Sequence, residues 1–373
     1  WNLLSILLAV TVRSSLAFTF SGGYSPILQS IGAHRASLCH GGSAFQLDSA
    51  LAARRASTHA RPLDFGRKQS LRMLMDVPKQ VLVTGASGKT GFFTFKKLRE
   101  LEKEFFTKGL VHSEKGAKKL QSIGASLGDS SAIKQSNKKL RDMGMVAEDE
   151  DPDIYIGDIV TKEGLDEAIQ GCDALVILTS GVPKLRKREI FKSILAKLIG
   201  QQRLPKFYYD QMPEQVDWIG CRNQIDAAKA AGVGHIVLVS SMGVSPQKNT
   251  PENILNKLGD GNILVWKAKA EEYLKASGVP YSIVHPGGLL NKPGGERELV
   301  FGVDDELLDD YEKRGATRAI PRADVASVVV ECLRHPDAVR NKSFDVVSKA
   351  PGQGTPTTDM AALFRAIPSA APH

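Results

Sequence analysis

The sequence has few cysteines, few aromatic residues and no long apolar run, and these shortages exclude several classes of protein. Four cysteines in 373 residues, with no Cys-x-x-Cys pair, suit neither a disulfide scaffold nor a zinc site, so we expect reduced, packed thiols and no metal. No stretch reaches the roughly 18 apolar residues that a membrane-spanning helix needs. With 42% hydrophobic and 24% charged residues, the chain is neither collagen-like nor wholly disordered. The cysteines are Cys39, Cys172, Cys221 and Cys332.

Acidic residues are scarce near the N-terminus, and the formal net charge of +8 is concentrated there. Residues 1–75 hold eight Lys or Arg residues against two acids, whereas the remainder of the chain is nearly balanced. A nucleic-acid-binding protein is expected to carry its basic residues on the folded domain. The distribution therefore argues against a nucleic-acid partner.

The N-terminal segment has the composition of a targeting presequence. Residues 3–12 form an apolar run of the length of a signal-peptide core, and small residues at Ser15 and Ala17 precede Phe18. The chain from Phe18 to about residue 76 is rich in Ser, Ala and Arg, as transit peptides are. This arrangement resembles the bipartite plastid-targeting sequences of algae with complex plastids. We predict a signal peptide over residues 1–17, a transit peptide up to residue 76 and plastid import. A disordered tail and an ordinary secretory signal are the alternatives. Because residue 1 is Trp, we expect the natural chain to start further upstream.

Short apolar runs alternate with helical patterns along the rest of the chain. The helical patterns include residues 215–231, in which Trp218, Cys221, Ile225 and Ala228 share one face. Such alternation predicts a parallel sheet covered by helices on both sides. We therefore predict one α/β domain over residues 77–373, a doubly wound parallel-sheet Rossmann fold with a small C-terminal substrate-side portion. The apolar runs lie at residues 80–84, 109–111, 154–156, 174–178, 236–239, 281–284 and 344–347.

A glycine-rich turn after the first predicted strand is the strongest chemical signal. Its first glycine permits a sharp turn, the second a close approach to a diphosphate, and the third close packing of the helix on the sheet. Free N–H groups at the helix start would hold the phosphates. The alternative of an ATP or GTP P-loop needs a glycine where Val83 stands, which argues against it. The turn reads Gly85-Ala86-Ser87-Gly88-Lys89-Thr90-Gly91.

The end of the second strand favours NADP over NAD. An NAD site places an acid there for the ribose 2′-hydroxyl, whereas an NADP site needs a cation for the 2′-phosphate. Here His112 and Ser113 follow the strand with no acid directly at its end, and Lys89 adds a positive charge on the same side. A surface histidine is the alternative reading of His112.

These motifs together resemble the atypical branch of the short-chain dehydrogenase/reductase superfamily, in particular the NAD(P)-binding Rossmann proteins of plants that carry TGASGxTG. The resemblance covers roughly residues 79–366. It rests on the sequence runs VLVTGASGKTG (81–91), GDI (157–159), ALVILTS (174–180), PEQVDWIG (213–220), NQIDAAK (223–229), SSMG (240–243), NILVWKAKAE (262–271), PGGLL (286–290) and PRADVA (321–326).

The resemblance implies a set of cofactor-binding positions. The glycine turn would hold the phosphates, and Asp158 and Ile159 would lie at the adenine. Other segments would line the ribose side and pass behind the nicotinamide. The ribose-side positions are Leu178, Thr179 and Ser180, and those behind the nicotinamide are Pro286, Gly287 and Gly288.

The catalytic set implied by the resemblance is incomplete. Members of the superfamily commonly use a Tyr four residues before a Lys, with a Ser at the end of the preceding strand. Lys267 matches the Lys, and Ser241, or less well Ser240, matches the Ser. Ile263 occupies the Tyr position and cannot transfer a proton. We expect Lys267 to bind the cofactor ribose, and a proton to come from another source. The candidates are Tyr208, Tyr209, His285 and water.

Two polar stretches interrupt the alternation. Residues 124–151 predict a loop. Residues 183–206 hold eight basic residues against Glu189, with Ile190, Ile194 and Leu198 four residues apart. A basic amphipathic helix of this kind suits a lid over the substrate pocket, which we favour, or a contact with an anionic membrane surface or an acidic partner. The basic residues are Lys184, Arg186, Lys187, Arg188, Lys192, Lys197, Arg203 and Lys206.

Two functions follow from these features. The first is an NADP-dependent oxidoreductase that acts on a small plastid metabolite. The second is a non-catalytic NADP(H)-binding protein that regulates or assembles a plastid partner. Ser241 and Lys267 favour the enzyme, and Ile263 favours the non-catalytic protein.

Overall fold

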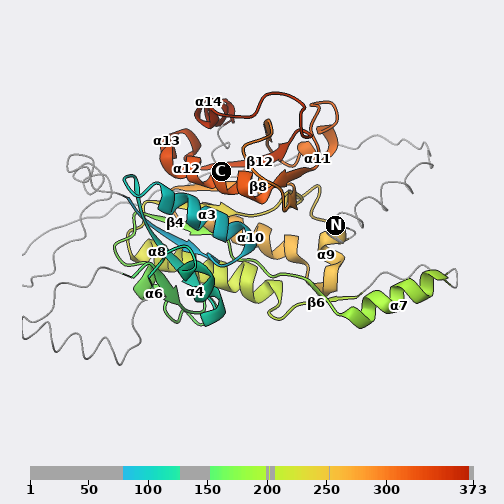
Figure 1. The fold of residues 1–373 in the computed structure, drawn as a ribbon, viewed down its shortest axis with the longest axis horizontal. Helices are drawn as coiled ribbons and strands as arrows, with labels where there is room; N and C mark the ends of the chain where they lie inside the picture. Colours follow the sequence, from blue (N-terminus) through green and yellow to red (C-terminus); the bar gives the residue numbers. More distant parts are fainter. Residues whose placement is uncertain (1–78, 127–151, 199–200, 202–205, 252, 369–373) are drawn as a thin grey trace, which may run out of the picture. The chain divides into compact units, whose positions relative to one another are not determined.

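An eight-stranded sheet forms the centre of the protein in a computed structural model that describes residues 79–126, 152–198, 201, 206–251 and 253–368 (Figure 1). Its strands are β1 (Lys79–Thr84), β2 (Phe105–Val111), β3 (Ile154–Ile156), β4 (Ala174–Ile177), β7 (His235–Val239), β8 (Tyr281–Pro286), β10 (Leu299–Gly302) and β12 (Lys342–Ser348). Their order across the sheet is β10-β12-β8-β7-β4-β1-β2-β3. The chain thus builds outward from β1 in one direction and then from β4 in the other, which is the doubly wound order that we predicted.

All neighbouring strands pair in parallel except β10, which runs antiparallel to β12. The central strands are buried on both faces, and every residue of β4 and β8 is buried. This double burial explains why these strands read as continuous apolar runs rather than alternating ones.

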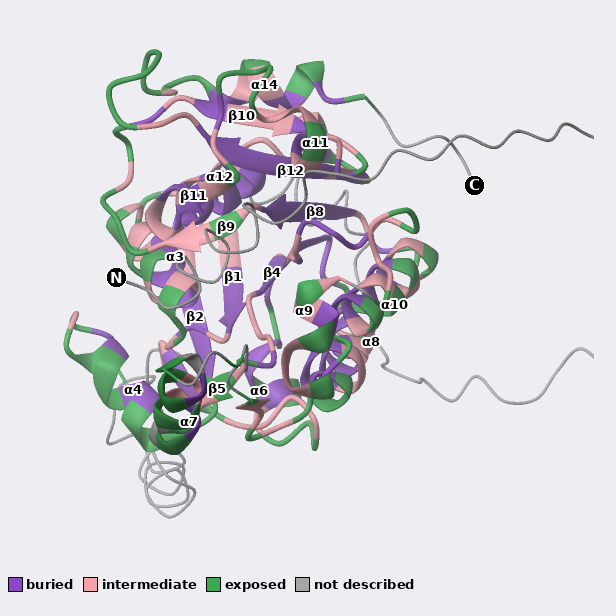
Figure 2. Cartoon of the chain, turned by 90° about the vertical axis from the view of Figure 1, so that its right-hand side faces the viewer, coloured by how far each residue is buried: buried purple, intermediate pink, exposed green. Residues whose placement is uncertain are grey.

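Helices cover both faces of the sheet (Figure 2). On one face α3 packs against α12, and Phe95, Leu98, Val325 and Val328 join the core there. On the other face α6, α8 and α10 bury Leu165, Ile225, Leu274 and their neighbours. The helices are α3 (Lys89–Glu100), α4 (Glu114–Gln121), α6 (Leu165–Ala168), α7 (Lys187–Leu198), α8 (Cys221–Ala230), α9 (Ile254–Lys257), α10 (Ile263–Ala276), α11 (Leu307–Asp310), α12 (Arg322–Arg334), α13 (Pro336–Val339) and α14 (Met360–Ala366).

Several elements differ from the predicted pattern. The sequence predicts one helix over residues 215–231, whereas the structure has a π-helix, η1 (Glu214–Gly220), that leads into α8. Two small sheets also lie outside the apolar runs: β5 (Lys184–Leu185) pairs antiparallel with β6 (Phe207–Tyr208), and β9 (Gly288–Leu290) pairs parallel with β11 (Ala319–Pro321). A short 3₁₀ turn, η2 (Leu258–Asp260), follows α9. The strands of the two small sheets are only two or three residues long, too short to show a periodicity.

The predicted presequence over residues 1–76, Cys39 and most of the loop predicted at 124–151 lie outside the described residues. All described residues belong to one compact unit. Its three cysteines, Cys172, Cys221 and Cys332, are free and buried, as predicted. Burial raises the pKa of the Cys221 thiol to about 12, so this thiol stays protonated and packed. None of the described helices is both long and apolar enough to cross a membrane.

Candidate cofactor and active site

The glycine turn joins β1 to α3 at the carboxyl edge of the sheet. Gly85 has φ +66°, and a Cβ atom there would lie 3.0 Å from the backbone of Leu178 at the end of β4. A Cβ atom on Gly91 would lie only 2.1 Å from the Gly85 carbonyl oxygen. The Gly88 N–H donates to that same oxygen over 2.8 Å. The turn is therefore closed so tightly that no side chain fits at Gly85 or Gly91.

The first turn of α3 presents backbone donors and no competing acceptor of its own. Gly88 is the N-cap residue, so no capping side chain binds the first N–H groups, and the first turn contains no acid. Uncapped N–H groups at the positive end of a helix dipole form an anion site. Gly88 and Lys89 are exposed, whereas Ala86 is buried beneath them. This cradle suits the diphosphate of a dinucleotide.

Three cationic or ionisable side chains lie near the ends of β1 and β2. Lys89 is exposed, and His112 directly follows β2 with its side chain 68% exposed. Lys119 of α4 donates from Nζ to the Ser87 carbonyl over 2.8 Å and lies 4.4 Å from the centre of the Phe92 ring. The sequence reasoning missed Lys119, because only the packing of α4 beside the turn brings it there.

Ser113 and Asp158 have local roles at the same edge. Ser113 is the N-cap of α4, and its hydroxyl accepts from the Gly116 N–H over 3.3 Å. Asp158 follows β3, and its Oδ1 accepts from the Val160 N–H over 2.7 Å. Its Oδ2 lies 3.9 Å from His112 Nδ1, so a protonated His112 would have a carboxylate partner. The positions predicted for the adenine and for the 2′-phosphate thus lie together, although Asp158 also shapes its own turn.

Ile159 packs toward η1. A Cβ atom on Gly220 would lie 2.6 Å from Ile159 Cδ1, and the Ile159 carbonyl accepts from Asn223 Nδ2 over 3.0 Å. Its side chain borders the apolar core beside α8. This packing fixes the loop after β3 against η1 and α8.

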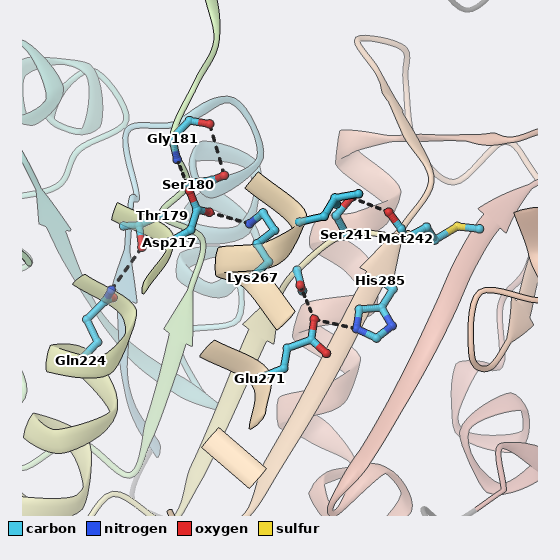
Figure 3. Close-up of polar contacts among 12 residues, drawn as sticks. Thr179, Ser180, Gly181, Asp217, Gln224, Ser241, Met242, Lys267, Glu271 and His285 are labelled. Atoms are coloured by element: carbon cyan, nitrogen blue, oxygen red, sulfur yellow. Dashed lines mark hydrogen bonds and ion pairs between the residues drawn. The ribbon is translucent and has the colours of Figure 1, made fainter. Parts of the chain in front are cut away.

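The end of β4 carries the segment predicted to line the ribose side. Leu178, Thr179 and Ser180 are all half-buried. Thr179 Oγ1 accepts from Gln224 Nε2 over 3.2 Å, and the Gly181 N–H donates to Asp217 Oδ2 over 2.8 Å (Figure 3). Residues of η1 and α8 therefore hold this segment in place.

Lys267 is buried and paired with a carboxylate. Its Nζ lies 2.8 Å from Asp217 Oδ1, with the two side chains 10% and 1% exposed. The same carboxylate binds the Gly181 N–H, so Asp217 links the end of β4 to α10 (Figure 3). Asp217 is an additional candidate that the sequence reasoning did not assign. The run PEQVDWIG contained it, but only the π-helix shows that this acid points inward.

The two serines after β7 have different partners. The Ser240 hydroxyl is buried and donates to Glu271 Oε1. The Ser241 hydroxyl is half-buried and donates to the carbonyl of Met242 over 3.0 Å (Figure 3). Ser240 therefore belongs to an internal network, whereas Ser241 remains the better match to the serine that the resemblance implies.

That internal network joins Glu271, His285 and Asp345. His285 Nε2 lies 3.0 Å from Glu271 Oε1, and His285 Nδ1 lies 3.4 Å from Asp345 Oδ1. Burial alone would lower the pKa of His285, but the charge of Glu271 and the contacts with both carboxylates raise it to about 10. Burial raises the pKa of Asp345, whereas His285 and Ser240 together hold the pKa of Glu271 below its ordinary value against the effect of burial. A charged His285–Glu271 pair thus lies beneath the site.

Two of the three side chains that the sequence offered as proton donors, Tyr209 and His285, are already bound to other groups. The Tyr209 hydroxyl donates to the Leu258 carbonyl over 2.9 Å, and burial and the charge of Asp217 raise its pKa to about 12. The guanidinium of Arg186 lies over the Tyr208 ring, with its Cζ atom 4.7 Å from the ring centre. His285 is enclosed by its two carboxylates. Ile263 opens α10, as the match to the missing Tyr requires.

The Pro286-Gly287-Gly288 run connects β8 to β9. Gly287 and Gly288 pass close to the backbone of Arg318, and a Cβ atom on Gly287 would lie 2.7 Å from the Arg318 carbonyl oxygen. The Gly288 N–H donates to that oxygen over 2.7 Å. Close approach to the backbone just before β11 therefore accounts for Gly287, whereas a Cβ atom on Gly288 would lie 3.3 Å from the same oxygen. The place of both glycines behind a nicotinamide stays a prediction. Among the described residues, no cluster of His, Cys, Asp and Glu could hold a metal ion.

Comparison with known proteins identifies the family. The family model described as NAD(P)H-binding matches residues 136–336, and the chain belongs to this family. Sanguinarine reductase of Eschscholzia californica is 44% identical over 301 residues, which cover 77% of this chain and 95% of that protein. An uncharacterised chloroplastic protein of Arabidopsis thaliana is 45% identical over 292 residues, which cover 78% and 76% of the two chains. These matches confirm the resemblance to an atypical short-chain dehydrogenase/reductase.

Among solved structures, the chain is similar to a putative NAD-dependent epimerase/dehydratase from Bacillus halodurans. The similarity covers 78% of this chain and 100% of that chain. The sequence identity is 20% and the TM-score is 0.48.

The buried ion pair predicts a measurable shift of one histidine. In Glu271→Gln the pKa of His285 should fall by several units from about 10, because burial then opposes a charge that has lost its nearest partner. NMR titration of the imidazole Cε1–H signals measures this pKa.

The exposed neighbour Glu272 provides the control, since Glu272→Gln should leave the His285 titration unchanged. The raised pKa of His285 means that its charge stabilises the folded protein fully below about pH 6.5, and that this contribution is lost as the pH rises through about 10. The lowered pKa of Glu271 means that the contribution of its charge is present above about pH 4.5 and is lost as the pH falls below that value. An unchanged His285 titration in Glu271→Gln would show that the carboxylate does not hold the charge.

Proposed function

We propose that the protein is an NADP(H)-dependent oxidoreductase that acts on a small molecule in the plastid. The observation that carries this proposal is the buried Lys267–Asp217 pair, held 2.8 Å apart and joined through Asp217 to Gly181, which follows β4, the neighbour of β1 in the sheet. A buried ion pair adds little net stability to a fold, so its presence here favours a role in the site. The similarity to sanguinarine reductase, which is 44% identical over 301 residues, supports the same class of reaction.

The residues of the chain have separate roles in this proposal. The glycine turn and the start of α3 would hold the diphosphate, and Lys267 would bind the nicotinamide ribose. Asp217 is a positioning residue, because it fixes the ammonium group of Lys267 and the backbone of Gly181. When bound, the nicotinamide supplies or accepts a hydride at its C4 atom. Ser241 would orient the acceptor group of the substrate through its hydroxyl.

The proton of such a reaction would reach the substrate from water by way of Ser241. Tyr209 and His285 are engaged with the Leu258 carbonyl and with two carboxylates, and Ile263 has no exchangeable side-chain proton. The Ser241 hydroxyl is half-buried, and in this proposal it would turn to the substrate from the Met242 carbonyl, to which it donates over 3.0 Å. The absence of the superfamily tyrosine therefore changes the proton route rather than the hydride chemistry.

We propose NADP rather than NAD as the cofactor. Lys89, His112 and Lys119 surround the region beside the glycine turn and the end of β2, where a 2′-phosphate would lie. Asp158 is the acid nearest to His112, at 3.9 Å, and it follows β3 rather than β2. A phosphate beside protonated His112 would replace this weak contact with a stronger one.

The alternative is a non-catalytic NADP(H)-binding protein with a regulatory or assembly role. Ile263 at the position of the tyrosine favours it. The plastid is proposed as the location in either case, on the composition of residues 1–76 and the chloroplastic relative that is 45% identical.

Removing the two predicted phosphate ligands separates the two cofactors. In Lys89→Ala/His112→Ala the Kd for NADPH should rise by about tenfold or more, since charge-assisted hydrogen bonds of about 1.5–3 kcal/mol are lost, whereas the Kd for NADH should rise less, because NADH has no 2′-phosphate to lose these contacts. Quenching of protein fluorescence measures both constants.

Lys96 lies on the same helix and is exposed, so Lys96→Ala provides the matched control. Equal weakening of NADPH and NADH would contradict the assignment of the 2′-phosphate.

Changing Lys267 tests the enzyme against the non-catalytic alternative. The wild type should oxidise NADPH with at least one member of a broad panel of carbonyl and enone substrates. Lys267→Met should lower kcat by about 100-fold or more, as is usual when a positioned polar group is lost from an active site. Stopped-flow absorbance at the NADPH band follows the reaction.

Lys269 lies two residues further on the same helix, with its ammonium 4.4 Å from the Trp218 ring centre, and Lys269→Ala should retain the wild-type rate. Tight NADPH binding without turnover across the whole panel would favour the non-catalytic alternative.

A further inference from the structure

Helix α7 is carried on a stalk formed by β5 and β6. Lys184 pairs with Tyr208 and Leu185 with Phe207 in this antiparallel ribbon, and α7 begins two residues after β5. Figure 1 shows α7 extending beyond the helices that cover the sheet. Within the described residues the helix is therefore presented outward at the tip of a ribbon, rather than packed into the core.

The amphipathic pattern of α7 is inverted with respect to a normal surface helix. Phe191, Ile194, Leu195 and Leu198 share one side at i, i+3, i+4 and i+7, and they are 67%, 55%, 50% and 77% exposed. Glu189 and Ala196, on the opposite side of the helix, are buried instead, each 7% exposed. A surface helix normally turns its apolar stripe toward the core. Here four large apolar side chains face solvent next to one another. Such a patch indicates a surface that contacts another protein or a membrane.

The exposed charge around this apolar side is positive. Arg188 and Lys192 are 65% and 50% exposed, whereas Glu189, the acid of the helix, has a side chain only 9% exposed and lies within 4 Å of both. Arg186 adds an exposed basic group at the base of the helix, where Lys184 is paired with the exposed carboxylate of Asp210. The face thus offers an apolar stripe with long cationic side chains on its flank. Anionic lipid headgroups above an acyl region have the complementary chemistry.

We infer that α7 is an interfacial membrane-binding helix that takes an anionic bilayer as its partner. The apolar side chains enter the boundary between headgroups and acyl chains, while Arg188 and Lys192 extend to the lipid phosphates. A helix at the tip of a ribbon reaches a flat surface without steric interference from the body of the protein. An acidic protein groove is the competing partner, and the experiment below distinguishes it. This inference does not depend on cofactor binding or turnover.

Vesicle binding by the full chain, read out at α7 itself, tests the inference. Residues 1–76 carry their own apolar run and basic residues, so the measurement must be local. We expect slower hydrogen exchange in peptides from residues 187–198 when vesicles of phosphatidylcholine and phosphatidylglycerol are added. Vesicles of phosphatidylcholine alone should protect these amides much less, and partition measured by flotation should be about tenfold weaker.

Two variants separate the apolar and electrostatic contributions. Phe191→Asn/Leu198→Asn should lower the partition to anionic vesicles by about tenfold, and Arg188→Glu/Lys192→Glu should remove most of its dependence on phosphatidylglycerol. Lys96→Glu/Lys229→Glu makes the same change in net charge on α3 and α8 and should leave the partition within about twofold of the wild type. Near-ultraviolet circular dichroism confirms that all the variants are folded.

Amides in residues 187–198 that stay unprotected by anionic vesicles, or that are protected equally in the wild type and both α7 variants, would overturn the inference. Protection of these amides by polyglutamate but not by anionic vesicles would also overturn it, and would identify the face as a docking site for an acidic protein.

Discussion

The close approach of Gly91 to the Gly85 carbonyl is the constraint on which the site depends. With only 2.1 Å available to a Cβ atom at Gly91, the helix start must lie directly against the turn that follows β1. This closure brings the uncapped N–H groups of α3 to the carboxyl edge of the sheet. Lys119 of α4 then binds the Ser87 carbonyl on the outer side of the turn. The proposed anion site would thus be a consequence of backbone packing rather than of any one side chain.

A second interaction connects this edge to the proposed catalytic residues. Asp217 binds the Gly181 N–H after β4 and the ammonium group of Lys267 on α10, so two elements that are far apart in sequence are fixed together. One turn further along α10, Glu271 holds Ser240 and His285 beneath the site. The same helix therefore carries a lysine toward the cofactor side and a carboxylate into the core. Ile263 occupies the start of this helix, where the superfamily tyrosine would stand.

The fold and the turn could be predicted because local rules determine them. Strands buried on both faces read as unbroken apolar runs, and only glycine fits the positions at Gly85 and Gly91. Asp217, Lys119 and the His285 network could not be predicted, because their roles arise from contacts between elements distant in sequence. The π-helix that turns Asp217 inward has no periodicity of its own in so short a segment. The inverted exposure of α7 likewise required the structure, since its sequence pattern also suits a lid.

Isothermal titration of the full chain with NADPH and NADH tests the central claim most directly, namely that the turn from Gly85 to Gly91 binds the diphosphate of a nicotinamide nucleotide. The account predicts saturable heat with NADPH and tighter binding than with NADH. It also predicts a Kd at least about tenfold higher in a folded Gly88→Asp variant, because a carboxylate would then face the phosphates. No heat with either nucleotide, or unchanged binding by Gly88→Asp, would contradict it.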